Sequence, residues 1–251
     1  MANNDLRTAF RGFHRRGSPL ILPNIWDAGS AKAVADAGAK ALATSSWAVA
    51  AAHGFGDGEE IPLALVIANL DRIDKVSGLP VTIDFEDGYG DTLEKLESSF
   101  GRLLATSAAG CNLEDGLSEA AIRPLEDQAG RIAVVRKIMD AAAPGFFINA
   151  RTDLFLCTPP ERHHAEEIVS QAIERANAYK NAGADGYFVP GLSDLSVLRT
   201  LADVVKLPIN VMAGDEALGG YIQAGVARVS FGPMTYLKAI GAASGFATER
   251  L

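Results

Sequence analysis

The sequence predicts a single (β/α)8 barrel, the TIM-barrel fold class, and three observations favour it. Eight short apolar runs alternate with amphipathic, helix-like segments over the 251 residues. The connections are short, as expected for parallel strands joined by right-handed βαβ crossovers. Polar and acidic residues gather just after the apolar runs, where such barrels carry their active sites. A doubly wound open sheet is the second possibility, although it usually contains fewer strands.

The strands are recognised as short runs rich in β-branched and other apolar residues. They are predicted at Leu20–Asn24, Ala41–Ser45, Val81–Asp84, Gly110–Glu114, Phe146–Ala150, Gly186–Val189, Ile209–Met212 and Arg228–Phe231. Amphipathic periodicity predicts helices at Ser30–Ala37, Ile61–Val76, Leu93–Ala108, Asp127–Ala142, Ala165–Ala182, Leu195–Val205 and Glu216–Ala224, with a last one from about Pro233. A first short helix would place Leu6, Phe10 and Phe13 on one side. No linker divides the chain, so residues 1–251 are predicted to form one domain.

Composition excludes several classes of protein. A net charge of −8 disfavours a nucleic-acid partner. No apolar run approaches the roughly 20 residues that span a bilayer, and the N-terminal stretch lacks the apolar core of a secretory signal. Cys111 and Cys157 are far apart and form no CxxC motif. We therefore expect a cytoplasmic protein without a membrane partner.

The stretch Val81–Gly90 is the chemical centre of the chain, with the sequence VTIDFEDGYG. Its apolar half reads as a buried strand and delivers Asp84, Glu86 and Asp87 to the strand's carboxyl end. Side chains alternate along a strand, so Asp84 and Glu86 are expected on the same side. Two carboxylates before a glycine-rich turn suit Mg²⁺. A solvated acidic loop is the alternative, but the position at a barrel mouth favours a metal.

Motifs over nearly the whole chain resemble the isocitrate lyase/phosphoenolpyruvate mutase superfamily. They are, in order, LILPNIWDAGSAKAVADAGAKALATSS, IDFEDGYG, NLEDG, INARTDLF, GADGYFVPG and PINVMAG. This resemblance implies a (β/α)8 barrel that often exchanges its last helix between subunits, hence a homo-oligomer, either a dimer or a tetramer. It also implies a bound Mg²⁺, with Mn²⁺ as an alternative, and a small-molecule carboxylate substrate that reacts through an enolate.

The resemblance also implies roles for individual residues. The metal-side acids are Asp84, Glu86 and Glu114. The residues implied to bind substrate are Ser45, Ser46, Trp47, Asp84, Arg151 and Asn210, and those implied to act in catalysis are Arg151, Asp57 and Glu114. The physical chemistry agrees, since Mg²⁺ stabilises an enolate oxygen as a Lewis acid and an arginine fork can clamp an anion.

Two departures from the family pattern bear on the reaction. No KKCGH segment, typical of the isocitrate and methylisocitrate lyases, is present, and the predicted lid Gly116–Gly130 lacks the lysine and asparagine of the mutases. The leading hypothesis is a Mg²⁺-dependent carbon–carbon lyase or hydrolase acting on a small 2-oxo or 2-hydroxy carboxylate. The alternatives are a hydrolase or mutase of the P–C bond of phosphonopyruvate, and a barrel that binds a 2-oxo acid without turnover.

Overall fold

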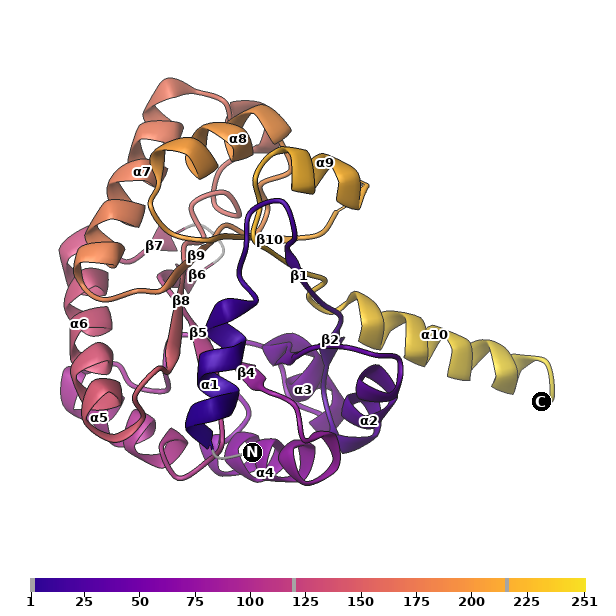
Figure 1. Ribbon diagram of the computed structural model, residues 1–251. Coiled ribbons are helices and arrows are strands. Elements are labelled where there is room, and N and C mark those ends of the chain that lie inside the picture. Colours follow the sequence, from indigo (N-terminus) through magenta and orange to yellow (C-terminus); the bar gives the residue numbers. More distant parts are fainter. Residues whose placement is uncertain (1–2, 119–120, 215–216) are drawn as a thin grey trace.

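The computed structural model, which describes residues 3–118, 121–214 and 217–251, confirms the (β/α)8 barrel (Figure 1). Within those residues, nine parallel strand segments form one sheet in the order β1-β11-β10-β9-β8-β5-β4-β3-β2. β1 (Leu20–Leu22) pairs with β11 (Arg228–Ser230), and β2 (Asn24–Ile25) pairs with β3 (Leu42–Thr44). Because β1 and β2 belong to one stretch of chain, the sheet closes on itself.

The first barrel strand differs from the continuous strand predicted at Leu20–Asn24. It is interrupted at Pro23, between β1 and β2. Proline has no backbone N–H to donate to a neighbouring strand, so the ladder breaks there. Because of this break, the residues before Pro23 pair with the last strand, β11, and the residues after it pair with β3.

The other barrel strands lie within one or two residues of the predicted runs. They are β4 (Val81–Asp84), β5 (Gly110–Glu114), β8 (Phe147–Arg151), β9 (Gly186–Phe188) and β10 (Ile209–Met212). The helices outside them are α2 (Ala28–Asp36), α4 (Leu63–Ser77), α5 (Leu93–Leu103), α6 (Leu125–Ala142), α7 (Glu166–Asn181), α8 (Leu195–Val204) and α9 (Leu218–Gln223), with the short 3₁₀ helix η1 (Pro160–Arg162) before α7. The predicted start of the seventh helix, Glu216, lies outside the described residues.

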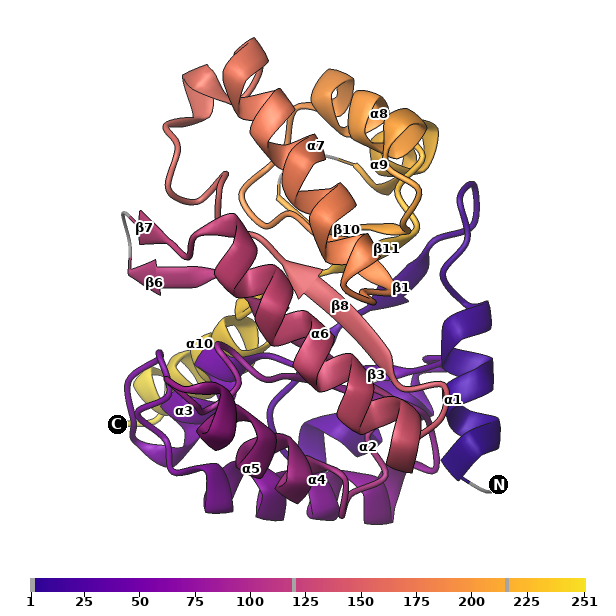
Figure 2. The same ribbon diagram turned by 90° about the vertical axis from the view of Figure 1, so that its left-hand side faces the viewer.

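Besides η1, a helix after β3 and a hairpin in the lid were not predicted. The chain leaves β3 directly into α3 (Ser46–His53), an alanine-rich helix with Ser45 as its N-cap. The predicted lid contains a hairpin of β6 (Gly116–Ser118) and β7 (Ala121–Ile122), and α6 begins soon after it. Figure 2 shows this hairpin at one end of the barrel.

The opposite end of the barrel is closed by α1 (Asn3–Gly12), as Figures 1 and 2 show. Phe10 is completely buried and packs edge-on against Phe147 at the start of β8, with ring centroids 5.6 Å apart. His14 stacks on the same ring at 4.1 Å. The predicted apolar side of this helix is thereby confirmed, and burying a side chain such as Phe10 stabilises the fold by about 1.5–3 kcal/mol. Only the other end of the barrel is open.

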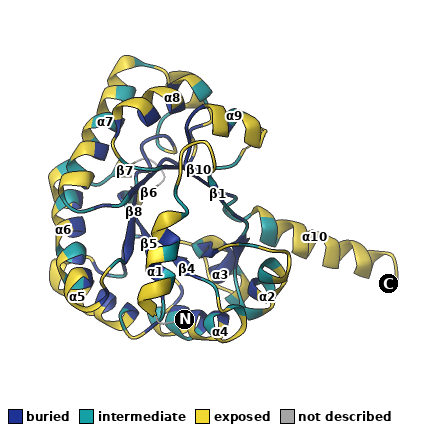
Figure 3. Cartoon of the chain, viewed as in Figure 1, coloured by how far each residue is buried: buried dark blue, intermediate teal, exposed yellow. Residues whose placement is uncertain are grey.

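The last helix, α10 (Met234–Thr248), projects away from the barrel (Figure 1) and has no buried residue (Figure 3). It exposes Leu237 and Ile240 at 46% and 50% of their surfaces. Where an eighth outer helix would pack, a groove of about 770 Å³ runs along β1 and α2, lined in part by Ile21 and Val34. No helix in the described residues is long and apolar enough to cross a membrane.

We expect the α10 of a second copy to fill this groove, which gives the first test. The double variant Leu237→Asp and Ile240→Asp should shift the protein from dimer or tetramer towards monomer and lower its Tm, because charges cannot be buried there. Light scattering coupled to size exclusion measures the mass. A wild-type protein that is monomeric at micromolar concentration would contradict the exchange.

Candidate active site

The open end of the barrel contains a cavity of about 650 Å³ at the carboxyl ends of the strands. Residues from three connecting loops and from strands β5, β6 and β8 line it. They are Asp57, Gly58, Glu59, Glu86, Asp87, Glu114, Gly116, Leu117, Arg151, Asp153, Leu156 and Cys157. The predicted acids Asp57, Glu86 and Glu114 therefore meet Arg151 in one space. This is the candidate active site.

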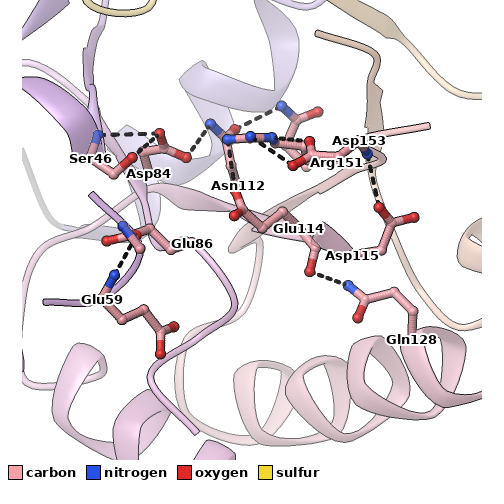
Figure 4. Close-up of polar contacts among 12 residues, drawn as sticks. Ser46, Glu59, Asp84, Glu86, Asn112, Glu114, Asp115, Gln128, Arg151 and Asp153 are labelled. Carbon is pink, nitrogen blue, oxygen red and sulfur yellow. Dashed lines mark hydrogen bonds and ion pairs between the residues drawn. The ribbon is translucent and has the colours of Figure 1, made fainter. Parts of the chain in front are cut away.

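Asp84 lies at the end of β4, where hydrogen bonds fix both of its oxygens (Figure 4). Oδ2 accepts from the backbone N and the hydroxyl of Ser46, at 3.2 and 3.0 Å. Oδ1 accepts from Nδ2 of Asn112 at 3.0 Å. Because Ser46 begins α3, the positive end of that helix also favours a carboxylate here. Asp84 is thus held in one orientation.

The neighbours of Ser46 point elsewhere. Ser45 uses its hydroxyl to cap α3, accepting from the N–H of Ala48 at 3.4 Å. Trp47 packs edge-on against Tyr236 of α10, with ring centroids 6.0 Å apart, and does not line the mouth cavity. Formation of α3 explains both positions, since a helix turns successive side chains by about 100°. Of the three predicted contacts, the structure brings Ser46 to Asp84.

Arg151, at the end of β8, is held between two carboxylates. Its Nη1 lies 2.7 Å from Oε2 of Glu114, and its Nε and Nη2 donate to Asp153 at 2.6 and 3.0 Å. Burial raises the pKa of Glu114, an effect that Arg151 opposes. Burial alone would lower the pKa of Arg151, but the two acids raise it. The arginine is therefore permanently charged and its orientation is fixed.

Asp115 supports this arrangement from behind and does not reach the mouth. It is completely buried, and it accepts from the hydroxyl of Tyr179 at 2.6 Å and from Nη1 of Arg175 at 3.0 Å. Its other oxygen accepts from the backbone N of Asp153 at 2.8 Å. Two residues of α7 thus fix the position of the loop that holds Arg151. Nothing in the local sequence of α7 signals this role.

Glu86 occupies a different position from the one expected. It lies beyond β4 with a φ of +49°, so strand alternation no longer applies. Oε2 accepts from the backbone N of Gly58 and of Glu59, at 2.8 and 2.7 Å. Oε1 accepts from the hydroxyl of Tyr89 at 3.1 Å. Both oxygens hold the loop that carries Asp57, and they do not point with Asp84 into one metal site.

Three residues of this region form a compact hydrogen-bonded group, here called the latch: Glu59, Glu86 and Tyr89. Glu59 accepts from the backbone N of Tyr89 at 2.6 Å and donates its own N–H to Glu86. These are the only non-glycine residues with positive φ in the described chain, at +63°, +49° and +55°. Such conformations cost about 1–3 kcal/mol each and persist only where surrounding contacts impose them. The latch therefore ties the Asp57 loop to the turn after β4.

Asp87 links the same turn to the lid. It accepts from Nη2 of Arg123 at 2.6 Å and from Nη2 of Arg131 at 3.0 Å. Arg123 directly follows the β6–β7 hairpin, and Arg131 lies in α6. Burial raises the pKa of Asp87, although both arginines lower it. The turn after β4 thus anchors both loops that flank the mouth.

Beneath Asp84, the interior of the barrel is polar. Asn112 accepts from Nη2 of Arg228 at 3.2 Å and from Nδ2 of Asn149 at 2.8 Å. Arg228 is fully buried, which lowers its pKa to about 10, and the charge of Asp84 opposes this shift. The predicted substrate residue Asn210 lies in this layer, 1% exposed, and accepts from Asn149 at 2.9 Å. Asn112 could have been found from sequence, because it precedes Glu114 by two residues on the same face of β5.

The donor set fits a hard divalent cation that keeps much of its water. Among the described residues, no three Asp, Glu, His or Cys side chains converge closely enough to ligate a metal on their own. Burial raises the pKa of Glu86 to about 7 and also raises the pKa of Asp57, and in both cases the charge of Asp84 adds to the shift. A cation beside Asp84 would favour the ionised form of each. Mg²⁺ commonly binds through few carboxylates and several waters.

The closed barrel and its acidic mouth define a (β/α)8 protein whose candidate site is built at the carboxyl ends of its strands. The sequence profile of phosphoenolpyruvate phosphomutase matches residues 10–251, so the chain belongs to that family. This confirms the resemblance to the isocitrate lyase/phosphoenolpyruvate mutase superfamily.

Several relatives are similar over most of the chain. An uncharacterized protein of Mycobacterium tuberculosis is 33% identical over 94% of this chain and 86% of its own length. The 2-methylisocitrate lyase of Escherichia coli is 31% identical over 80% of this chain and 67% of its own length. These relatives place the chain among lyases and mutases without fixing its substrate.

Solved structures agree with this placement. A Burkholderia cenocepacia protein, provisionally assigned as a phosphonomutase, superposes with a TM-score of 0.94 at 45% identity over 99% of both chains. A phosphonopyruvate hydrolase in complex with oxalate and Mg²⁺ has a TM-score of 0.84 at 18% identity, covering 100% of this chain and 87% of its own. At that identity the second likeness concerns the fold alone.

The latch can be tested with Tyr89→Phe, which removes one hydrogen bond to Glu86. Hydrogen–deuterium exchange at Gly58 and Glu59 should become faster, and stability should fall by about 0.5–1.5 kcal/mol. Tyr236→Phe on α10 is the matched control and should leave that exchange unchanged. Unaltered exchange in Tyr89→Phe would show that the loop is held by other contacts.

The raised pKa of Glu86 predicts a pH dependence of stability. Its pKa is about 7 in the folded protein and near 4.5 when unfolded, so the folded state binds the extra proton between these values. The stabilisation is complete below pH 4.5 and is lost as pH rises through 7. In metal-free buffer, wild type should lose on the order of 3 kcal/mol more than Glu86→Gln between pH 4.5 and 8. Urea unfolding at several pH values measures this difference, and parallel profiles would contradict it.

Proposed function

We propose that the protein is a Mg²⁺-dependent lyase or hydrolase that cleaves a carbon–carbon bond in a small 2-oxo or 2-hydroxy carboxylate through an enolate. The observation that carries this proposal is a pair of fixed, opposite charges at the carboxyl ends of two barrel strands, Asp84 at the end of β4 and Arg151 at the end of β8. Asp84 is oriented by Ser46 and Asn112, and Arg151 is oriented by Glu114 and Asp153. Charged groups that are already oriented can stabilise the charge that develops in the transition state, because they do not have to reorganise during the reaction.

Asp84 would hold the Mg²⁺ directly, whereas Glu86 and Glu114, whose side chains do not converge with Asp84 on one point, would hold it through its waters. Bound there, the ion would act as a Lewis acid towards the oxygen that becomes the enolate oxygen. The start of α3 at Ser46 would bind the carboxylate head of the substrate, because helix N-termini favour anions. Arg151 would orient the substrate through the part of its guanidinium group that is not covered by Glu114 and Asp153.

Asp57 is proposed to move the proton. Partial burial and the charge of Asp84 raise its pKa, so it can accept a proton from a substrate hydroxyl and return it to the carbanion carbon. The latch holds its loop beside the mouth, and closure of the β6–β7 hairpin would exclude water. We further propose that the working enzyme is a homo-oligomer of the cytoplasm, where cysteine thiols stay reduced.

A second candidate is cleavage of the P–C bond of phosphonopyruvate. It is favoured by the 45% identity to the protein provisionally assigned as a phosphonomutase. Proton and phosphorus NMR on one panel, with Mg²⁺ and with chelator, separates the candidates. Mg²⁺-dependent pyruvate, glyoxylate or oxalate supports carbon–carbon cleavage, whereas phosphate or phosphoenolpyruvate supports P–C chemistry. If a 2-oxo acid binds but no product forms, the result supports the third alternative, a protein that binds the acid without turning it over.

Substitution of the two fixed charges tests the proposal further. Asp84→Asn removes the metal-side charge at nearly unchanged size, and Arg151→Lys keeps the positive charge but removes the planar fork. Each should lower kcat at least about a hundredfold while the circular dichroism spectrum is unchanged. Asp91→Asn, an exposed carboxylate paired with Lys95, is the control and should keep full activity. Near-normal turnover in both site variants would rule out the proposed roles.

A further inference from the structure

Charge is distributed unevenly around the mouth cavity. Arg151 is the only lysine or arginine among its described lining residues, which include six carboxylates: Asp57, Glu59, Glu86, Asp87, Glu114 and Asp153. The three nitrogens of Arg151 are all engaged, Nη1 with Glu114 and Nε and Nη2 with Asp153. Little positive charge is therefore left to pair with an additional anionic group.

The two nearest other cations do not change this balance. Arg123 and Arg131 both bind Asp87, and their side chains are only 15% and 4% exposed. Neither lines the cavity. All lysines and arginines of the chain fall within the described ranges, so no other part of the same copy supplies one to this lining.

The remaining wall of the cavity is apolar. Leu117 of β6 and Leu156 of the loop after β8 both line it, and they are 53% and 46% exposed. Cys157 lies beside Leu156 in the same lining. Large apolar side chains that face a cavity and remain accessible are typical of a surface that a ligand covers.

We infer that the substrate carries its negative charge in a 2-oxo or 2-hydroxy carboxylate head, while the tail beyond the scissile bond is uncharged and apolar. The tail would lie against Leu117 and Leu156. The inference rests on the proposed function, and it narrows the substrate to monocarboxylic acids with an alkyl or aryl tail. A tricarboxylate or a phosphonate would place a second anion among carboxylates that already share one arginine.

The physical reason is repulsion together with desolvation. An anionic tail would lose water on entering the cavity and would find no unengaged cation there, so it would be rejected. An alkyl tail would instead cover the exposed surface of the two leucines. The mouth cavity therefore selects among substrates by the charge of their tails, whichever head group they carry.

Binding of three enolate-like probes in saturating Mg²⁺ tests this by titration calorimetry. Oxalate reports on the head site alone. N-isobutyloxamate and N-oxalylglycine share one head and have tails of nearly equal shape, the first uncharged and the second a carboxylate. We expect N-isobutyloxamate to bind at least about tenfold more tightly than N-oxalylglycine.

A charge-inserting variant tests the position of the tail. Leu156→Arg should reverse the preference, so that N-oxalylglycine becomes the tighter ligand and its affinity rises by more than about tenfold. Leu117→Arg is the second variant should the first fail to fold. Val204→Arg, at the exposed C-terminal end of α8, is the control and should leave the affinity ratio unchanged.

Each outcome is decisive. Oxalate binding with the expected preference and its reversal supports the inference. Oxalate binding with equal or tighter binding of N-oxalylglycine overturns the inference but leaves the proposed function intact. An unchanged ratio in both charge variants shows that the tail does not lie on this wall. Failure of oxalate itself to bind overturns the head site, and the proposed function and the inference fall together.

Discussion

The ion pairs that Arg151 makes with Glu114 and Asp153 hold the mouth of the barrel together. A closed parallel barrel brings the carboxyl ends of all its strands to one rim, so acids that are distant in sequence become neighbours. Without a cation between them, Glu114 and Asp153 would repel each other in a partly buried space. Removing one member of such a pair leaves an uncompensated buried charge, which typically costs 3–5 kcal/mol. The rim is therefore stable only with this arginine in place, and the buried Asp115 with its α7 partners holds it there.

The polar layer under the mouth serves the same purpose from inside the barrel. Barrels of this kind usually fill their interior with branched apolar side chains. Here Arg228, Asn112 and Asp84 form a continuous chain of hydrogen bonds from the lower interior to the rim. The positive charge of Arg228 partly offsets the negative charge of Asp84. Asn112 is hydrogen-bonded to both groups, so it also fixes the orientation of Asp84. Burying Arg228 with so few partners is costly, and the contribution to a fixed Asp84 is the physical reason we give for it.

The barrel could be predicted from sequence because its strands and helices are encoded locally, in runs such as Val81–Asp84 and in the periodicity of the helices. The gathering of Asp84, Glu114 and Arg151 followed from the same topology. The details that failed depend on tertiary contacts. Glu86 leaves the strand in a positive-φ conformation imposed by the loop it binds, which no alternation rule anticipates. The helix after β3 had a local signal, since Ser45 precedes a run rich in alanine, and it redirects Trp47 towards α10.

The latch gives the site a constraint of its own. The two oxygens of Glu86 accept from Gly58, Glu59 and Tyr89, so they cannot contact a metal ion directly without giving up hydrogen bonds to the Asp57 loop. Cation binding and loop position are then linked, and by reciprocity whatever closes the loop alters the affinity for the cation. The two oxygens of Asp84 are also hydrogen-bonded, to Ser46 and Asn112, but neither partner belongs to the Asp57 loop. The two acids of one short motif therefore have different surroundings: Asp84 is bound to Ser46 and Asn112, and Glu86 is bound to the loop that carries the proposed proton-moving group Asp57.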